Sequence, residues 1–187
     1  MILIVTRVAA PVTERQAARI KPLGLLADDP AGLLAAWDQV ESFWNETVND
    51  AMRLPAEMLG ARVNGEWSFI ETLRHLVFVT DVWIGDVVLQ RVSAYDPIGL
   101  PPDFVTNGVE LGLDLDAQPS IDEVLAARAR GMALARHTIA DVDAAGLDRT
   151  CAGYDGKFIV LGAFQNVIFE EWAHHVFAGR DLAELGG

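Results

Sequence analysis

The chain has 187 residues, of which 51% are hydrophobic and 22% charged, and its formal net charge is −13. This length and composition are those of one ordinary globular domain and exclude disordered and fibrous proteins. The negative charge would repel phosphate backbones and anionic lipid surfaces, so neither nucleic acid nor membrane is expected as a partner.

The single cysteine, Cys151, excludes an internal disulfide and a thiolate metal cluster. The opening residues MILIVTRVAAP are interrupted by Arg7 and Pro11 and are too short for a signal-peptide core. Elsewhere the apolar runs fall short of the ~20 residues that a membrane-spanning helix needs. These features predict a soluble protein in a reducing, cytoplasmic setting.

We expect two parts in the chain, a peripheral N-terminal segment at 1–29 and one helical domain at 30–187. From Pro30 onward, apolar residues recur with the 3.6-residue helical period until Pro55 ends the pattern. The first long helix is therefore predicted between these two prolines.

Capping boxes predict where two further helices begin. Ser68 with Glu71 opens a helix over about 68–91, and Ser120 with Glu123 opens one over about 120–142. Between them lies a polar, proline-containing stretch without a clear period, which predicts a long loop of the kind that often lines a functional site.

The last helix is predicted over about 158–185, after a turn-rich connection with two glycines. Four long amphipathic helices without a strong strand signal predict an all-α fold. The expected architecture is a four-helix bundle with long loops that could hold short strands.

The stretch EEWAHH in the last helix contains two Glu/His pairs at the i, i+4 spacing, which places both members on one helix face. Glu171 and His175 fall on the apolar stripe, whereas Glu170 and His174 lie on the neighbouring register and are expected at the solvent-facing flank. A buried carboxylate needs a partner, so Glu171 is expected to be paired or bound to a cation. The stripe comprises Leu161, Phe164, Ile168, Glu171, His175, Ala178, Leu182 and Leu185.

His75 lies on the apolar stripe of the second helix with Phe78 and Val82, so it too should face inward. With Glu171 and His175 it makes a set of two imidazoles and one carboxylate, typical of a divalent metal site that keeps one position open. Zinc is the leading candidate, and nickel and non-haem iron suit the same ligand types. A buried polar network without metal is the alternative.

Arg128 falls on the apolar stripe of the third helix, an unusual place for a guanidinium. It is expected either to bind a substrate carboxylate or to pair with Glu171 or another buried acid. The ion pair is the preferred interpretation.

The segments EWSFIETLRHLVFVTDVWIGDVVL and EEWAHHVFAGRDLAEL resemble the DinB-like superfamily of metal-binding four-helix bundles, and the resemblance covers roughly 33–185. The sequence is most similar to the branch that includes the mycothiol-dependent maleylpyruvate isomerase domain, whose metal is held by His, Glu and His. The resemblance implies that His75, Glu171 and His175 are the ligands.

The same resemblance implies a function for the site. Known activities in the superfamily involve low-molecular-weight thiols, so a transferase or isomerase acting with mycothiol or a related thiol is expected. The alternative is a metal-binding module without catalysis, such as a sensor or scaffold. Resemblance also implies a homodimer.

Overall fold

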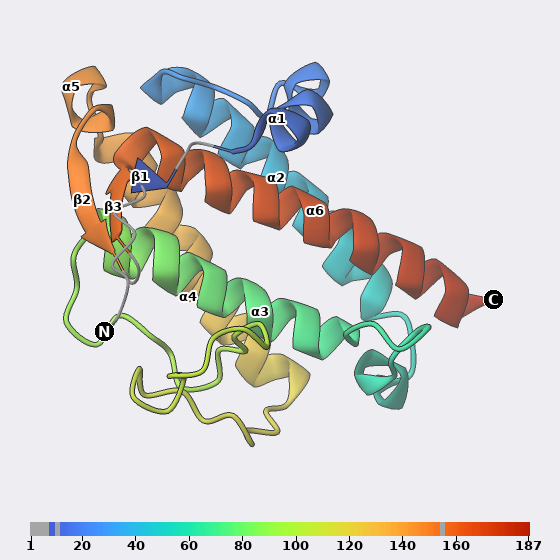
Figure 1. Ribbon diagram of the computed structural model, residues 1–187. Helices are drawn as coiled ribbons and strands as arrows, with labels where there is room; N and C mark the ends of the chain where they lie inside the picture. Colours follow the sequence, from blue (N-terminus) through green and yellow to red (C-terminus); the bar gives the residue numbers. More distant parts are fainter. Residues whose placement is uncertain (1–7, 10–11, 154–155) are drawn as a thin grey trace.

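The chain is mostly helical in the computed structural model, which describes residues 8–9, 12–153 and 156–187 (Figure 1). The long elements are α2 (Pro30–Ala51), α3 (Phe69–Thr80) with its continuation as the π-helix η3 (Asp81–Val88), α4 (Ile121–Asp141) and α6 (Val160–Gly186). The short ones are α1 (Glu14–Ile20), η1 (Lys21–Leu23), η2 (Ala56–Gly60) and α5 (Ala144–Leu147). Residues 1–7 and 10–11 of the expected N-terminal segment lie outside the described residues.

Side-chain caps fix the starts of the central helices, as the sequence predicts. Ser68 Oγ accepts from the backbone N–H of Glu71 at 3.2 Å, and the Glu71 carboxylate accepts from the backbone N–H of Ser68 at 2.8 Å. Ser120 and Glu123 make the same reciprocal pair. These bonds satisfy backbone donors that the first helical turn leaves free.

The four long helices share one hydrophobic core. Helix α6 packs against α2 and α3, and α4 packs against the same two helices from the other side. Trp37 and Phe164 are among its largest fully buried side chains, and Ile20 and Leu25 place part of the N-terminal segment in this core. No helix of the described residues combines the length and apolarity needed to cross a bilayer.

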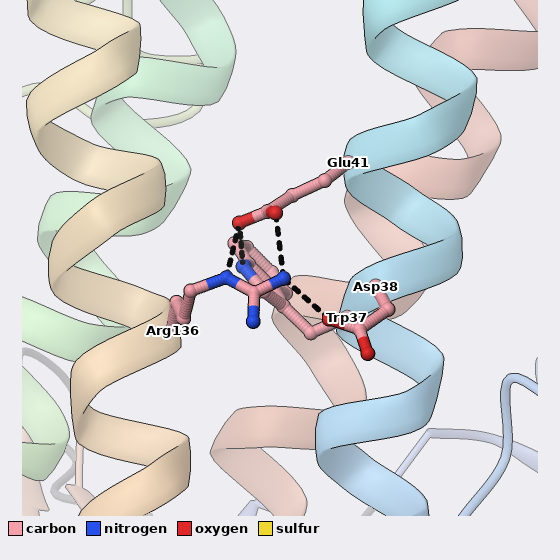
Figure 2. Close-up of polar contacts among 4 residues, drawn as sticks. All are labelled: Trp37, Asp38, Glu41 and Arg136. Atoms are coloured by element: carbon pink, nitrogen blue, oxygen red, sulfur yellow. Dashed lines mark hydrogen bonds and ion pairs between the residues drawn. The ribbon is translucent and has the colours of Figure 1, made fainter.

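A partly exposed polar cluster connects α2 to α4 (Figure 2). Arg136 on α4 donates to both carboxylate oxygens of Glu41, at 2.9 and 2.6 Å, and also to Asp38. Trp37 Nε1 donates to Glu41 at 3.0 Å. The two helices are thereby held in one register along their contact.

A three-stranded sheet lies at the end of the molecule opposite the C-terminus (Figure 1). It contains β1 (Val8–Ala9), β2 (Thr150–Gly153) and β3 (Gly156–Ile159), in the order β1-β3-β2. Strand β3 pairs parallel with β1 and antiparallel with β2. Strands β2 and β3 thus occupy the connection that the sequence marks as turn-rich, and β1 comes from the N-terminal segment.

The predicted long loop connects η3 to α4 and is anchored on α3. Arg74 Nε donates to the Ile98 carbonyl at 2.8 Å, and the Arg74 carbonyl accepts from Leu100 N at 3.1 Å. At the start of η3, Asp81 accepts from the backbone N–H of Asp96 at 2.8 Å. These bonds hold the loop against the face of α3 that carries His75.

Candidate metal centre

Three side chains with metal-ligand chemistry meet between α3 and α6. His75, Glu170 and His174 each offer one ligand atom, and these atoms lie within 4.8 Å of one another. One helical turn separates Glu170 from His174, whose Nε2 is 3.4 Å from the Glu170 carboxylate. The rings of His75 and His174 have centroids 4.8 Å apart. The group therefore has the composition and spacing to hold a metal ion.

A backbone carbonyl orients His75. Its Nδ1 lies 3.1 Å from the carbonyl oxygen of Leu100, and because a carbonyl only accepts, Nδ1 must carry the proton. The unprotonated Nε2 is then the atom available to a metal. A hydrogen bond from the other ring nitrogen is the usual way in which a histidine ligand is oriented. The side chain is 6% exposed, and burial, with a smaller contribution from His174, lowers the pKa of His75 to about 4. The imidazole is thus neutral near pH 7.

Aromatic rings border the cluster on its outer side. The Trp67 ring lies 4.6 Å from that of His75 and 6.1 Å from that of His174, between centroids. Phe177 meets His174 edge-on at 6.2 Å. Such apolar walls limit the access of water and lower the local dielectric around the ligand atoms.

A pocket of about 410 Å³ adjoins the cluster, with His174 in its wall. Trp67 and Phe177 provide apolar lining, and Arg62, Thr72 and Asp103 provide polar lining. A small molecule in this pocket would lie against His174. The long loop contributes both Asp103 and the carbonyl that holds His75, as expected for a loop that lines a site.

Glu171 forms an ion pair and does not join the other predicted metal ligands. The side chain is fully buried, and its two oxygens accept from the two terminal nitrogens of Arg128, each at 2.7 Å. This confirms the preferred interpretation of Arg128 as the partner of a buried acid. With both oxygens taken, Glu171 could bind a metal only by leaving a buried guanidinium unpaired.

His175 points toward α2 and away from the cluster. Its Nδ1 lies 2.8 Å from Thr47 Oγ1, and its ring stacks on Phe43 with centroids 5.0 Å apart. The predicted set of His75, Glu171 and His175 is therefore not brought together.

The structure instead joins His75 to the neighbouring pair, Glu170 and His174, which is half-buried. The expectation that this pair faces solvent thus needs correction.

The width of the buried face of α6 explains this shift by one residue. The helix packs against both α2 and α3, so it buries two adjacent registers over its first half. The apolar pattern of the sequence then does not distinguish between two Glu/His pairs that have the same i, i+4 spacing. The inward position of Arg128 could have distinguished Glu170 from Glu171, because the carboxylate that pairs with this guanidinium is not free to bind a metal. The buried positions of the two registers include Val160, Ala163, Phe164, Val167, Ile168 and Glu171.

Comparison with known proteins gives one positive result. A family model described as the DinB superfamily matches residues 33–177, which is most of the chain. Searches of curated proteins and of solved structures returned no match. The matched segment includes α3, α4 and the part of α6 with Glu170 and His174. The chain belongs to the DinB superfamily.

Proposed function

We propose that this protein binds one divalent metal ion through His75, Glu170 and His174, within the four-helix bundle that its superfamily implies. The observation that carries the proposal is the convergence of three ligand atoms within 4.8 Å from two helices. The donor set fits the group: two imidazoles and one carboxylate suit zinc with one position left for another ligand. Nickel and iron remain alternatives by the same chemistry.

The protein's own residues would prepare this site before any ligand arrives. Leu100 holds the ring of His75 with Nε2 unprotonated, and Trp67 and Phe177 exclude water from one side. When bound, a divalent ion supplies a Lewis acid that lowers the pKa of a ligand at its open position. The adjoining pocket is of the size in which small molecules bind.

These features support a metal-dependent enzyme that acts with a low-molecular-weight thiol, as a transferase or an isomerase. A thiol is a suitable ligand because a metal-bound thiol loses its proton readily. The rival proposal, a metal sensor or scaffold, needs the same ligands but no turnover. Activity therefore separates the two proposals, and metal binding tests what they share.

The two adjacent Glu/His pairs provide matched controls for metal binding. Loss of an orienting group beside a ligand already lowers metal affinity about 10–100-fold, so His174→Ala, which removes a ligand, should lower it by at least that much. His175→Ala should bind metal like the wild type. Isothermal titration and elemental analysis of protein purified without metal affinity tags measure both. Metal loss in His175→Ala but not in His174→Ala would overturn this assignment and favour the ligands predicted from the sequence, Glu171 and His175.

Turnover is tested with the metal-loaded protein and low-molecular-weight thiols such as mycothiol and bacillithiol. If the metal-loaded protein neither binds these thiols nor turns over a thiol conjugate, the enzyme proposal is refuted and the sensor or scaffold proposal is kept.

A further inference from the structure

Arg62, the one arginine or lysine among the described residues that line the pocket, is already engaged in an ion pair. Arg62 donates through Nε and Nη2 to the two carboxylate oxygens of Glu71, at 2.9 and 2.5 Å. The inward cation that the sequence offered for a substrate carboxylate, Arg128, is bound to Glu171. Glu71 thus takes two of the five N–H donors of Arg62, and an anionic ligand that reached the others would also meet the carboxylates of the pocket.

Three carboxylates line the same pocket. Glu66 and Asp181 both accept from Arg180, at 2.5 and 2.7 Å. Asp103 makes no hydrogen bond or ion pair within the described part of the chain, although it lies in the pocket wall. The charged lining therefore consists of three carboxylates and one guanidinium, and the charge of Asp103 also helps to raise the pKa of Arg62.

Thr72 adds a polar group without a protein partner to the wall of the pocket. The residue is 6% exposed and lines the pocket, yet its hydroxyl makes no hydrogen bond to any described residue. Helical threonines elsewhere in the chain donate to the carbonyl four residues before them: Thr80 donates to Leu76 at 3.0 Å and Thr47 to Phe43 at 2.9 Å. The Thr72 hydroxyl is therefore free to bond to a ligand in the pocket.

We propose that this pocket selects small ligands that carry a protonated amine, and that it disfavours anionic ligands of the same size. An ammonium group donates hydrogen bonds that Asp103 and the Thr72 oxygen can accept, and the Trp67 ring face also attracts a cation. With the proposed metal at His75, Glu170 and His174, the favoured class is an aminothiol. The inference rests on the proposed function in that respect.

Three thiols of similar size and different charge test this selection: cysteamine (positive), 2-mercaptoethanol (neutral) and 3-mercaptopropionate (negative). Cobalt(II)-loaded protein is titrated with each thiol at one pH and low ionic strength, and the thiolate-to-cobalt absorption reports binding. Each variant is compared with the wild type for the same thiol, which removes differences in the thiols' own acidity and chelation.

Asp103→Asn should weaken cysteamine binding about threefold, the range expected for one exposed charge, and strengthen mercaptopropionate binding by a similar factor. Mercaptoethanol binding should not change. Thr72→Val should weaken cysteamine binding more than mercaptoethanol binding. The matched control is Asp148→Asn, which removes the same charge beyond α5 at the far end of the molecule and should alter none of the three.

The outcomes separate this inference from the metal assignment. Wild-type protein that binds no cobalt would refute the metal site, and the inference would fall with it. Cobalt binding with the same thiol affinities in Asp103→Asn as in Asp148→Asn would refute the charge selection alone. Weaker mercaptopropionate binding in Asp103→Asn than in the wild type would refute it as well.

Discussion

At the scale of single residues, Glu171, which pairs with Arg128 of α4, and the candidate ligand Glu170 are consecutive on α6 but have separate tasks. Glu171 is fully buried and accepts two short hydrogen bonds from Arg128, whereas Glu170 is half-buried and lies beside His75 and His174. A buried pair of this kind adds little net stability compared with apolar residues, but removing one partner leaves the other as an unpaired buried charge and destabilises the fold. The pair therefore fixes which face of α6 turns toward α4.

Arg128→Met tests this division of tasks. It should destabilise the protein by about 3–5 kcal/mol because Glu171 is left buried without a partner. Metal stoichiometry should stay near that of the wild type, since neither residue belongs to the candidate centre. Denaturant unfolding and elemental analysis provide the two measurements.

Arg130→Met is the control for that experiment, because Arg130 is largely exposed where it pairs with Asp96. It should cost less than about 1 kcal/mol. Equal effects of the two substitutions, or loss of metal in Arg128→Met at unchanged stability, would contradict the structural role of Arg128.

The site was predicted in part from such residue-level reasoning. His75 is buried as its apolar stripe indicates, and Arg128 pairs with the acid proposed for it. The choice between Glu170 and Glu171 depends on which neighbouring helix each side chain meets. That information lies in the packing of three helices, so spacing along one helix does not contain it.

At the scale of elements, the π-helix η3 brings an acid to the base of the long loop. Asp81 begins this element and accepts from the backbone N–H of Asp96. Burial raises the pKa of Asp81 to about 7, helped by the charge of Asp96 and opposed by that hydrogen bond and by Arg91 and Arg130. The start of the long loop is thus held by a hydrogen bond to the Asp81 carboxyl, which titrates near neutral pH.

Comparison of the wild type with Asp81→Asn should reveal how the titration of Asp81 affects the free energy of unfolding. The folded pKa lies above the unfolded value, so ionising Asp81 disfavours the folded state, and the wild type loses stability as pH rises from about 4 toward 7. The asparagine oxygen can still accept from Asp96 N, so the variant should be more stable at pH 8, on the order of a few kcal/mol. The difference should shrink toward pH 4, as thermal unfolding across this range would record. A difference that is constant with pH would contradict a raised pKa.

The sequence predicts these elements unevenly, for physical reasons. Caps and periodicity depend on neighbouring residues, so the starts of α3 and α4 are predicted to within a residue or two. The π-helix widens the turn without a change in composition, and the 3.6-residue pattern does not reveal it. The sheet depends on pairing between β1 and β3, from opposite ends of the chain, which no local pattern encodes.

At the scale of the whole molecule, the candidate centre bridges α3 and α6, two helices far apart in sequence. An ion that binds there in the folded state alone would stabilise the protein by mass action, by about 2.7 kcal/mol at a free concentration of 100 Kd. The melting temperature should therefore rise on adding zinc and fall again with a chelator. His175→Ala should keep this response and His174→Ala should lose it. An equal rise in both variants would place the stabilising ion elsewhere.

The contact between Leu100 and His75 has a further consequence for how such proteins can diverge. The acceptor is a main-chain carbonyl, so the residue at this position can change identity without removing the hydrogen bond. What the histidine requires is the path of the chain, which the bonds between Arg74 and the loop maintain. Relatives that share this arrangement are therefore better identified by a loop of conserved length than by any particular residue within it.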